Sequence, residues 1–89
     1  MDIRIVIIED DQIIREGYTL LIGHAEGYSV VNSYASFDEA AKNIVNDAPG
    51  VILLDIELPG TNGIEAIPKL KKLVPHAHIL ILTVYESEK

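Results

Sequence analysis

The 89 residues are enough for one domain, and an apolar fraction of 48% with 24% charged residues argues against a disordered chain. Fourteen acidic residues against seven basic ones leave a formal charge of -7, which disfavours direct contact with nucleic acid. The absence of Cys excludes disulfides and Cys-ligated zinc and agrees with a cytoplasmic protein, and apolar runs of only four residues show no signal peptide or membrane span.

The first half of the chain predicts two strands that alternate with two helices. Ile3–Ile8 is almost wholly Ile and Val, which indicates a strand buried on both faces. Apolar residues at helical spacing predict a helix over Asp11–Gly23. Tyr28–Tyr34 is rich in β-formers, and the Ser-x-x-Glu pattern from Ser36 to Glu39 is a capping box that opens a second helix.

The second half repeats the alternation. Val51–Leu54 is a short apolar strand that Asp55 ends. A loop rich in Pro and Gly follows, and helical periodicity resumes over Ile64–Val74. Pro68 predicts either a helix that begins late enough to hold it in the first turn or a kinked helix. Ile79–Leu82 is the last predicted strand.

This βαβαβαβ pattern predicts an α/β fold, a doubly wound parallel sheet covered on both sides. Several strands lack polar alternation, which is typical of parallel sheets with helices on both faces. In such sheets a ligand site forms beyond the carboxyl ends of the strands. The polar residues at those ends are therefore the candidates for function.

Carboxylates gather at two of these strand ends. Glu9 and Asp10 follow the first strand, whereas Asp55 ends the third and Glu57 comes two residues later. If the two strands are neighbours, the carboxylates converge, and their mutual repulsion favours a hard divalent cation such as Mg²⁺. The alternative for Glu9 to Asp11 is simple capping of the following helix, because acidic residues favour helix N-termini.

Asp55 and Thr83 each allow two interpretations. Asp55 lies on a rigid strand end before a loop that leaves it reachable, which is how a nucleophile is presented. Alternatively it is a strand-ending acid that accepts hydrogen bonds from loop amides. Thr83 is either an ordinary β-branched strand end or a hydroxyl that donates to a phosphoryl oxygen.

The three strand-end segments together resemble the receiver domains of two-component response regulators. They correspond in order and spacing to the acidic pair, the phosphoacceptor loop and the switch-hydroxyl strand of that family, and they read Ile-Val-Ile-Ile-Glu9-Asp10-Asp11, Leu-Leu-Asp55-Ile-Glu-Leu-Pro59-Gly60-Thr-Asn62-Gly63 and Ile-Leu-Thr83-Val-Tyr85. Arg15-Glu16-Gly17, the Pro-containing third helix and Thr83-Val84-Tyr85 are most similar to receivers that precede a helix-turn-helix output domain.

The resemblance implies a flavodoxin-like fold and a role for each residue. Asp55 would accept a phosphoryl group from a sensor histidine kinase. Mg²⁺ would be bound directly by Asp10, Asp55 and the backbone carbonyl of Glu57, and by Glu9 through water. Thr83 would turn towards the phosphoryl group and switch the conformation of the domain, which would control transcription through the output domain.

The resemblance also implies parts that we do not find in the 89 residues. The family pattern has an invariant Lys at the end of a fifth strand, so we expect residues 1–89 to be a receiver that is incomplete at the C-terminus. The expected strand order is 2-1-3-4, without the fifth strand and the last helices. Because this leaves the fourth strand as an open edge, we predict a homodimer or a domain-swapped assembly that covers it.

Two other functions remain open at the sequence level. One is a receiver-like interaction domain that is not phosphorylated, which the missing Lys favours. The other is a fragment of a phosphatase similar to the haloacid dehalogenases, because Asp55 is followed two residues later by an acid. That second residue should be Asp rather than Glu57, and the loop should follow an early strand, so this alternative fits less well.

Overall fold

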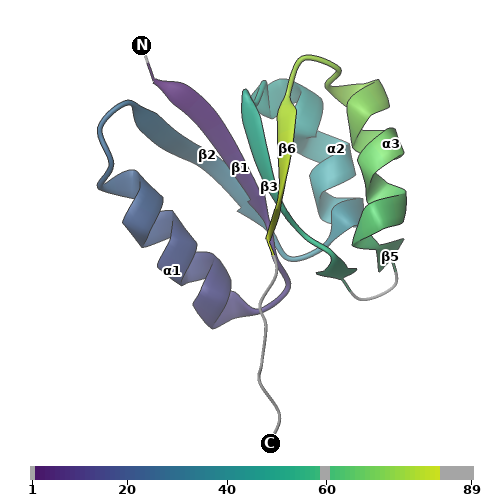
Figure 1. Ribbon diagram of the computed structural model, residues 1–89, viewed down its shortest axis with the longest axis horizontal. Coiled ribbons are helices and arrows are strands. Elements are labelled where there is room, and N and C mark those ends of the chain that lie inside the picture. The colour runs from purple at the N-terminus through teal and green to yellow at the C-terminus, as the bar shows by residue number, and fades with distance from the viewer. Residues whose placement is uncertain (1, 59–60, 83–89) are drawn as a thin grey trace, which may run out of the picture.

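Four parallel strands form the main sheet, in the order β2-β1-β3-β6. The computed structural model describes residues 2–58 and 61–82. The main-sheet strands are β1 (Ile3–Ile8), β2 (Tyr28–Tyr34), β3 (Val51–Asp55) and β6 (His78–Leu82), and the helices are α1 (Gln12–Gly23), α2 (Phe37–Asp47) and α3 (Gly63–Leu73) (Figure 1). The predicted α/β class and the strand order 2-1-3-4 are confirmed, since β6 is the fourth strand of the sheet.

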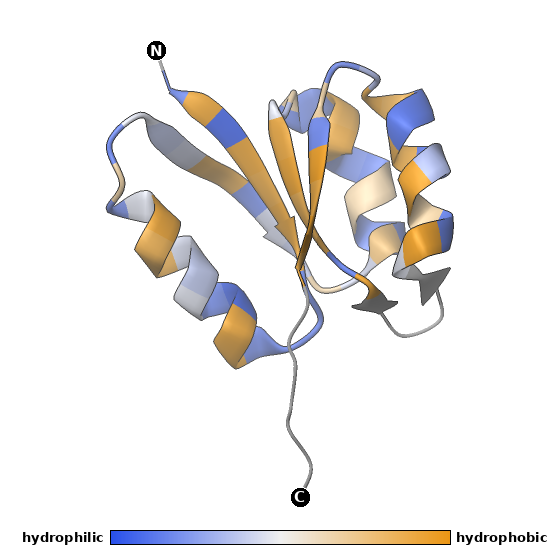
Figure 2. Ribbon diagram, viewed as in Figure 1, coloured by the Kyte–Doolittle hydropathy of each residue, from blue (hydrophilic) through white to orange (hydrophobic). Residues whose placement is uncertain are grey.

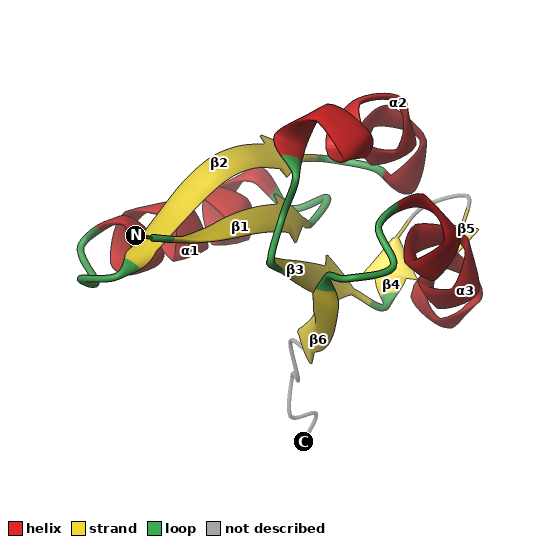
Figure 3. Cartoon of the chain, turned by 90° about the horizontal axis from the view of Figure 1, so that it is seen from above, coloured by secondary structure: helices red, strands yellow, loops and turns green. Residues whose placement is uncertain are grey.

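The sheet has helices on both faces, with α1 on one side and α2 and α3 on the other (Figures 1 and 3). Alternate residues of the buried strands supply the two layers of core. The larger core, beneath α2 and α3, includes Val6, Ile8, Ile52, Leu54, Ile44 and Leu70. The smaller core, beneath α1, consists of Ile5, Ile7 and Leu53, against which Tyr18 and Ile22 pack. The period of two in each strand thus divides consecutive Ile and Leu residues between opposite faces.

Two of the helices begin at side-chain caps. The side chain of Asp11 accepts from the Ile14 amide at 3.1 Å, so Asp11 is the residue of the acidic run Glu9 to Asp11 that caps α1. Ser36 Oγ accepts from the Glu39 amide at 3.2 Å, which is the first half of the predicted capping box, whereas Glu39 Oε1 accepts from the amide of Ala35, one residue before the cap, at 3.4 Å. The starts of α1 and α2 are therefore fixed by local sequence.

A residue of the first strand caps the end of α2. The helix continues to Asp47, and Ala48 ends it with a left-handed φ of 50°. The Asp47 carbonyl accepts from Nε and Nη2 of Arg4 at 2.9 and 2.8 Å. Arg4 is the one charged residue of β1, so its side chain joins the first strand to the C-terminus of α2 and satisfies a carbonyl left over at the helix end.

Two features near α3 differ from expectation. The helix begins at Gly63, so Pro68 lies beyond the first turn, and of the two predicted alternatives the late start is wrong. The segment before α3, expected as a loop, also contains the short strands β4 (Glu57–Leu58) and β5 (Thr61–Asn62), which pair antiparallel. Two-residue strands carry too little periodicity for detection from sequence.

The edge strand β6 differs from the other apolar strands in its exposure. Figure 2 shows β1, β3 and β6 as largely hydrophobic. In β6, however, Leu80 is 55% exposed and Ile81 is 42% exposed. Among the described strands β6 pairs only with β3. In the described part of the chain, every helix is too short or too polar to pass through a bilayer.

Candidate functional site

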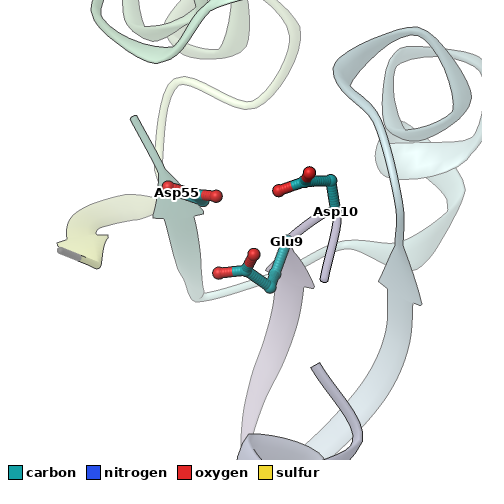
Figure 4. Close-up of side chains that lie close together, drawn as sticks. All are labelled: Glu9, Asp10 and Asp55. Atoms are coloured by element: carbon teal, nitrogen blue, oxygen red, sulfur yellow. The ribbon is translucent and has the colours of Figure 1, made fainter. Parts of the chain in front are cut away.

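Three carboxylates meet at the carboxyl ends of β1 and β3. Glu9 and Asp10 directly follow β1, and Asp55 is the last residue of β3. The two strands pair in parallel, with Ile8 opposite Leu54, so these residues emerge at the same edge of the sheet. One ligand oxygen from each side chain lies within 4.8 Å of the others (Figure 4). The predicted convergence of the acidic residues is therefore confirmed.

Glu9 has an environment that is unfavourable for a carboxylate. Its side chain is 2% exposed, and Oε1 is buried with no hydrogen-bond partner among the described residues. Oε2 accepts from the Asp11 amide at 3.0 Å. Burial, opposed by this hydrogen bond and assisted by the charge of Asp55, raises the pKa of Glu9 from 4.5 to about 7.

Oε1 of Glu9, which has no hydrogen-bond partner among the described residues, is a second observation in favour of a cation site, in addition to the clustering of three acidic residues. A buried carboxylate oxygen without a donor is costly, and the cost is relieved either by a proton or by a cation. All three candidate ligands are carboxylates, which suit a hard ion such as Mg²⁺. The donor set therefore fits the ion that the sequence predicts.

Asp55 is held at the rim of the core. It is 7% exposed and follows three buried residues, Ile52 to Leu54, so its backbone is fixed by the strand. Its β6 neighbour in the sheet is Leu82. Just beyond it, the Gly63 amide donates to the Ile56 carbonyl at 2.9 Å and ties the start of α3 to the end of β3. A rigid strand end thus carries the candidate nucleophile, as its sequence position predicts.

Comparisons with known proteins identify the family of this site. The family profile described as "Response regulator receiver domain" matches residues 5–89. The chain belongs to the receiver-domain family. It is also 34% identical to a CheY-like receiver domain protein from Methanospirillum hungatei JF-1, covering 98% of this chain and 68% of that one, with a TM-score of 0.79.

Two further relatives show what larger proteins this receiver resembles. A LuxR-family two-component response regulator from Aurantimonas sp. SI85-9A1 is 36% identical, with a TM-score of 0.86, over 97% of this chain and 61% of that one. The Oxygen regulatory protein NreC of Staphylococcus haemolyticus is 32% identical over 97% of this chain and 40% of its own length. The receiver thus spans about 40% of the curated relatives it matches.

For two predicted site residues, Glu57 and Thr83, the described part of the structure gives no side-chain position. Glu57 starts β4, two residues after Asp55, where its backbone pairs with Asn62. Its carbonyl as a metal ligand stays a prediction. Thr83 lies outside the described residues, and its role stays a prediction as well.

The structure adds Arg15 and Gly63 to the site, two residues that the sequence analysis does not assign to it. Arg15 Nη1 donates to the Glu9 carbonyl at 2.7 Å, across six positions of the chain. Gly63 lies against the strand end, so close that a Cβ atom there would be 2.2 Å from Ile56 Cα and 2.7 Å from the Asp55 carbonyl oxygen. The sequence signals for them are weak, because an Arg in a helix and a Gly in a loop are ordinary.

We expect Gly63→Ala to destabilise the receiver. Its methyl group would collide with backbone atoms, which cannot rotate away, so the end of β3 must move. The free energy of unfolding should fall by about 1–3 kcal/mol, the usual range for overpacking, as measured by urea denaturation.

Gly17→Ala is the matched control for this variant. Gly17 lies inside α1, and a Cβ atom there meets nothing within 4 Å. Ala should therefore raise the free energy of unfolding by about 0.5–1 kcal/mol. Equal stability of Gly63→Ala and the unmodified chain would show that the contact at Gly63 has no such effect.

Proposed function

We propose that this receiver takes a phosphoryl group on Asp55 and so acts as the phosphoacceptor of a two-component signalling system. The observation that carries the proposal is the meeting of Glu9, Asp10 and Asp55, whose ligand oxygens lie within 4.8 Å of one another. One buried oxygen of Glu9 has no hydrogen-bond partner among the described residues. Receiver domains as a family are phosphorylated by histidine kinases and are not classed as enzymes. The family match and the position of Asp55 both support this role.

Mg²⁺ is the metal proposed for the site. Asp10 and Asp55 would bind it directly with the Glu57 backbone carbonyl, and Glu9 would bind it through water. When bound, the metal neutralises charge on the phosphoryl oxygens during transfer. Without a cation, three neighbouring carboxylates would repel an anionic donor.

The proposed chemical step uses the Asp55 carboxylate as the nucleophile. One carboxylate oxygen attacks phosphorus, the phosphorus–nitrogen bond of the kinase phosphohistidine breaks, and its electron pair returns to the imidazole. The product is an acyl phosphate on Asp55. The strand end contributes by holding the carboxylate in place, since phosphoryl transfer depends mainly on positioning and electrostatic stabilisation.

The signalling partners follow from the relatives and remain part of the proposal. A sensor histidine kinase would donate the phosphoryl group, and Thr83 would respond to it. The LuxR-family regulator among the similar proteins supports a DNA-binding output domain as the downstream element. Control of transcription would then pass through that domain, because the charge of -7 makes this segment a poor ligand for DNA.

One experiment separates this function from its rivals. The chain is incubated with a small-molecule phosphodonor and Mg²⁺, and its mass, the donor consumed and beryllofluoride binding are followed. One phosphoryl group per chain, with beryllofluoride bound in the same proportion, supports the receiver. Many turnovers of donor per chain support a phosphatase. A folded chain that gains neither label nor beryllofluoride supports a receiver-like interaction domain.

We also propose that the 89-residue polypeptide pairs with a second copy through β6. This strand offers an unpaired edge among the described strands and two exposed apolar side chains, Leu80 and Ile81. A second β6 could satisfy the free backbone groups and cover the apolar surface. Analytical ultracentrifugation at micromolar concentration should show a dimer that Leu80→Lys weakens by about tenfold or more. A chain that sediments only as a monomer contradicts the pairing.

A further inference from the structure

Arg15 reaches from the first turn of α1 back to the acidic turn that precedes the helix. β1 ends at Ile8 and α1 begins at Gln12, so Glu9 and Asp10 lie between the two elements. Arg15 Nη1 donates to the Glu9 carbonyl at 2.7 Å and lies 3.5 Å from the Asp10 carbonyl. Arg15 is half-buried beside this turn, and the charge of its guanidinium strengthens the shorter hydrogen bond.

The Glu9 carbonyl belongs to the peptide plane that leads into Asp10. Because a peptide unit is planar, fixing its oxygen also fixes the direction in which the Asp10 Cα leaves it. The amide of Glu9 donates to the Tyr34 carbonyl at 3.0 Å, and its Oε2 accepts from the Asp11 amide at 3.0 Å. Arg15 completes this set by holding the remaining backbone group of Glu9.

We propose that Arg15 is a positioning residue for the metal site, holding the turn so that the Asp10 carboxylate faces Asp55. The inference rests on the proposed function, since it concerns the affinity of the same site for Mg²⁺. A guanidinium placed only for its charge would repel a cation, so its removal should tighten Mg²⁺ binding. A guanidinium that positions the ligands has the opposite effect, because its removal releases the turn. The sign of the change in affinity distinguishes the two roles.

The test compares Arg15→Met with Arg4→Met by titration calorimetry with MgCl₂. Both substitutions remove one positive charge and side-chain hydrogen bonding to a backbone carbonyl. Arg4, however, lies near the amino end of β1, where it donates to the Asp47 carbonyl at the end of α2. We expect Arg15→Met to weaken Mg²⁺ binding about tenfold, in the range seen when residues supporting metal ligands are changed. Arg4→Met should leave the dissociation constant unchanged, and Arg15→Lys should restore part of the affinity because it retains a donor.

Labelling by the phosphodonor supplies a second readout. In Arg15→Met the Mg²⁺ concentration for half-maximal labelling should rise about tenfold, while the rate at saturating Mg²⁺ returns close to that of the unmodified chain, since Asp55 itself is intact. Unchanged or tighter binding in Arg15→Met overturns the inference, as does an equal loss in Arg4→Met. Normal Mg²⁺ uptake without any labelling would refute the proposed function and leave the role of Arg15 standing. A chain that binds no Mg²⁺ refutes both.

Discussion

Asp55→Asn should abolish labelling by the phosphodonor, from one phosphoryl group per chain to none. The amide that replaces the carboxylate carries no charge and is not a nucleophile. The other two carboxylates of the cluster, Glu9 and Asp10, follow β1 rather than β3 and therefore do not take the position of Asp55. Mass spectrometry after incubation with donor and Mg²⁺ measures the loss.

The same substitution should stabilise the metal-free chain. Asp55 adds to the repulsion that raises the pKa of Glu9, so removing its charge lets Glu9 ionise at less cost. We expect a gain of about 1 kcal/mol at pH 8 in the presence of a chelator. Loss of labelling together with higher stability cannot be explained by misfolding.

Asp38→Asn is the control for both measurements. Asp38 is an exposed carboxylate in the first turn of α2 and is not a member of the acidic cluster, and the change in atoms is identical. Labelling should persist in this variant, while stability should fall slightly because a helix N-terminus favours negative charge. Labelling that survives in Asp55→Asn would place the acceptor elsewhere.

Metal-free stability should fall as the pH rises, because of Glu9. Its pKa is raised from 4.5 to about 7 by burial and the neighbouring carboxylates. Between these two values the unfolded chain releases this proton while the folded chain keeps it. The folded state therefore binds more protons than the unfolded state, and stability is lost as pH climbs from 4.5 through 7. The loss due to this group is on the order of 3 kcal/mol by pH 8.

Mg²⁺ should reverse this dependence, because the ion requires the ionised carboxylate. The affinity of the chain for Mg²⁺ should fall up to about tenfold for each unit of pH below 7, because Glu9 must release a proton when the ion binds. Urea denaturation at pH 5, 6, 7 and 8, with chelator and with Mg²⁺, measures both effects. In metal-free Glu9→Gln, the free energy of unfolding should show little of this decline as the pH rises.

Glu26→Gln provides the comparison for Glu9→Gln. Glu26 is exposed in the turn between α1 and β2, and its substitution should leave the pH profile as it was. If Glu9→Gln and the unmodified chain respond alike between pH 5 and 8, Glu9 does not titrate in this range and the account of its environment is wrong.

Local sequence was sufficient for most of the fold. The strand Ile3–Ile8 and the capping box at Ser36 each depend on residues within a few positions, so their sequence patterns and the observed elements agree. The end of α2 does not depend on local sequence alone, because Arg4 of β1, 43 positions from Asp47 in the sequence, caps it. The start of α3 likewise depends on the close approach of Gly63 to Ile56. Neither contact leaves a periodic signal in the chain.

The sequence by itself determined the residue types of the site and their positions at strand ends. Apolar runs end in Glu9, Asp10 and Asp55, and parallel strands place their carboxyl ends at one edge. The resemblance to receivers supplied the strand order 2-1-3-4, in which the first and third strands are neighbours, and the structure confirms it. Only the tertiary structure decided that Glu9 is buried with an oxygen that has no hydrogen-bond partner among the described residues, and that Arg15 turns back to the Glu9 carbonyl. Strand order, burial and side-chain direction arise from contacts between distant segments, whereas period and capping arise from neighbours along the chain.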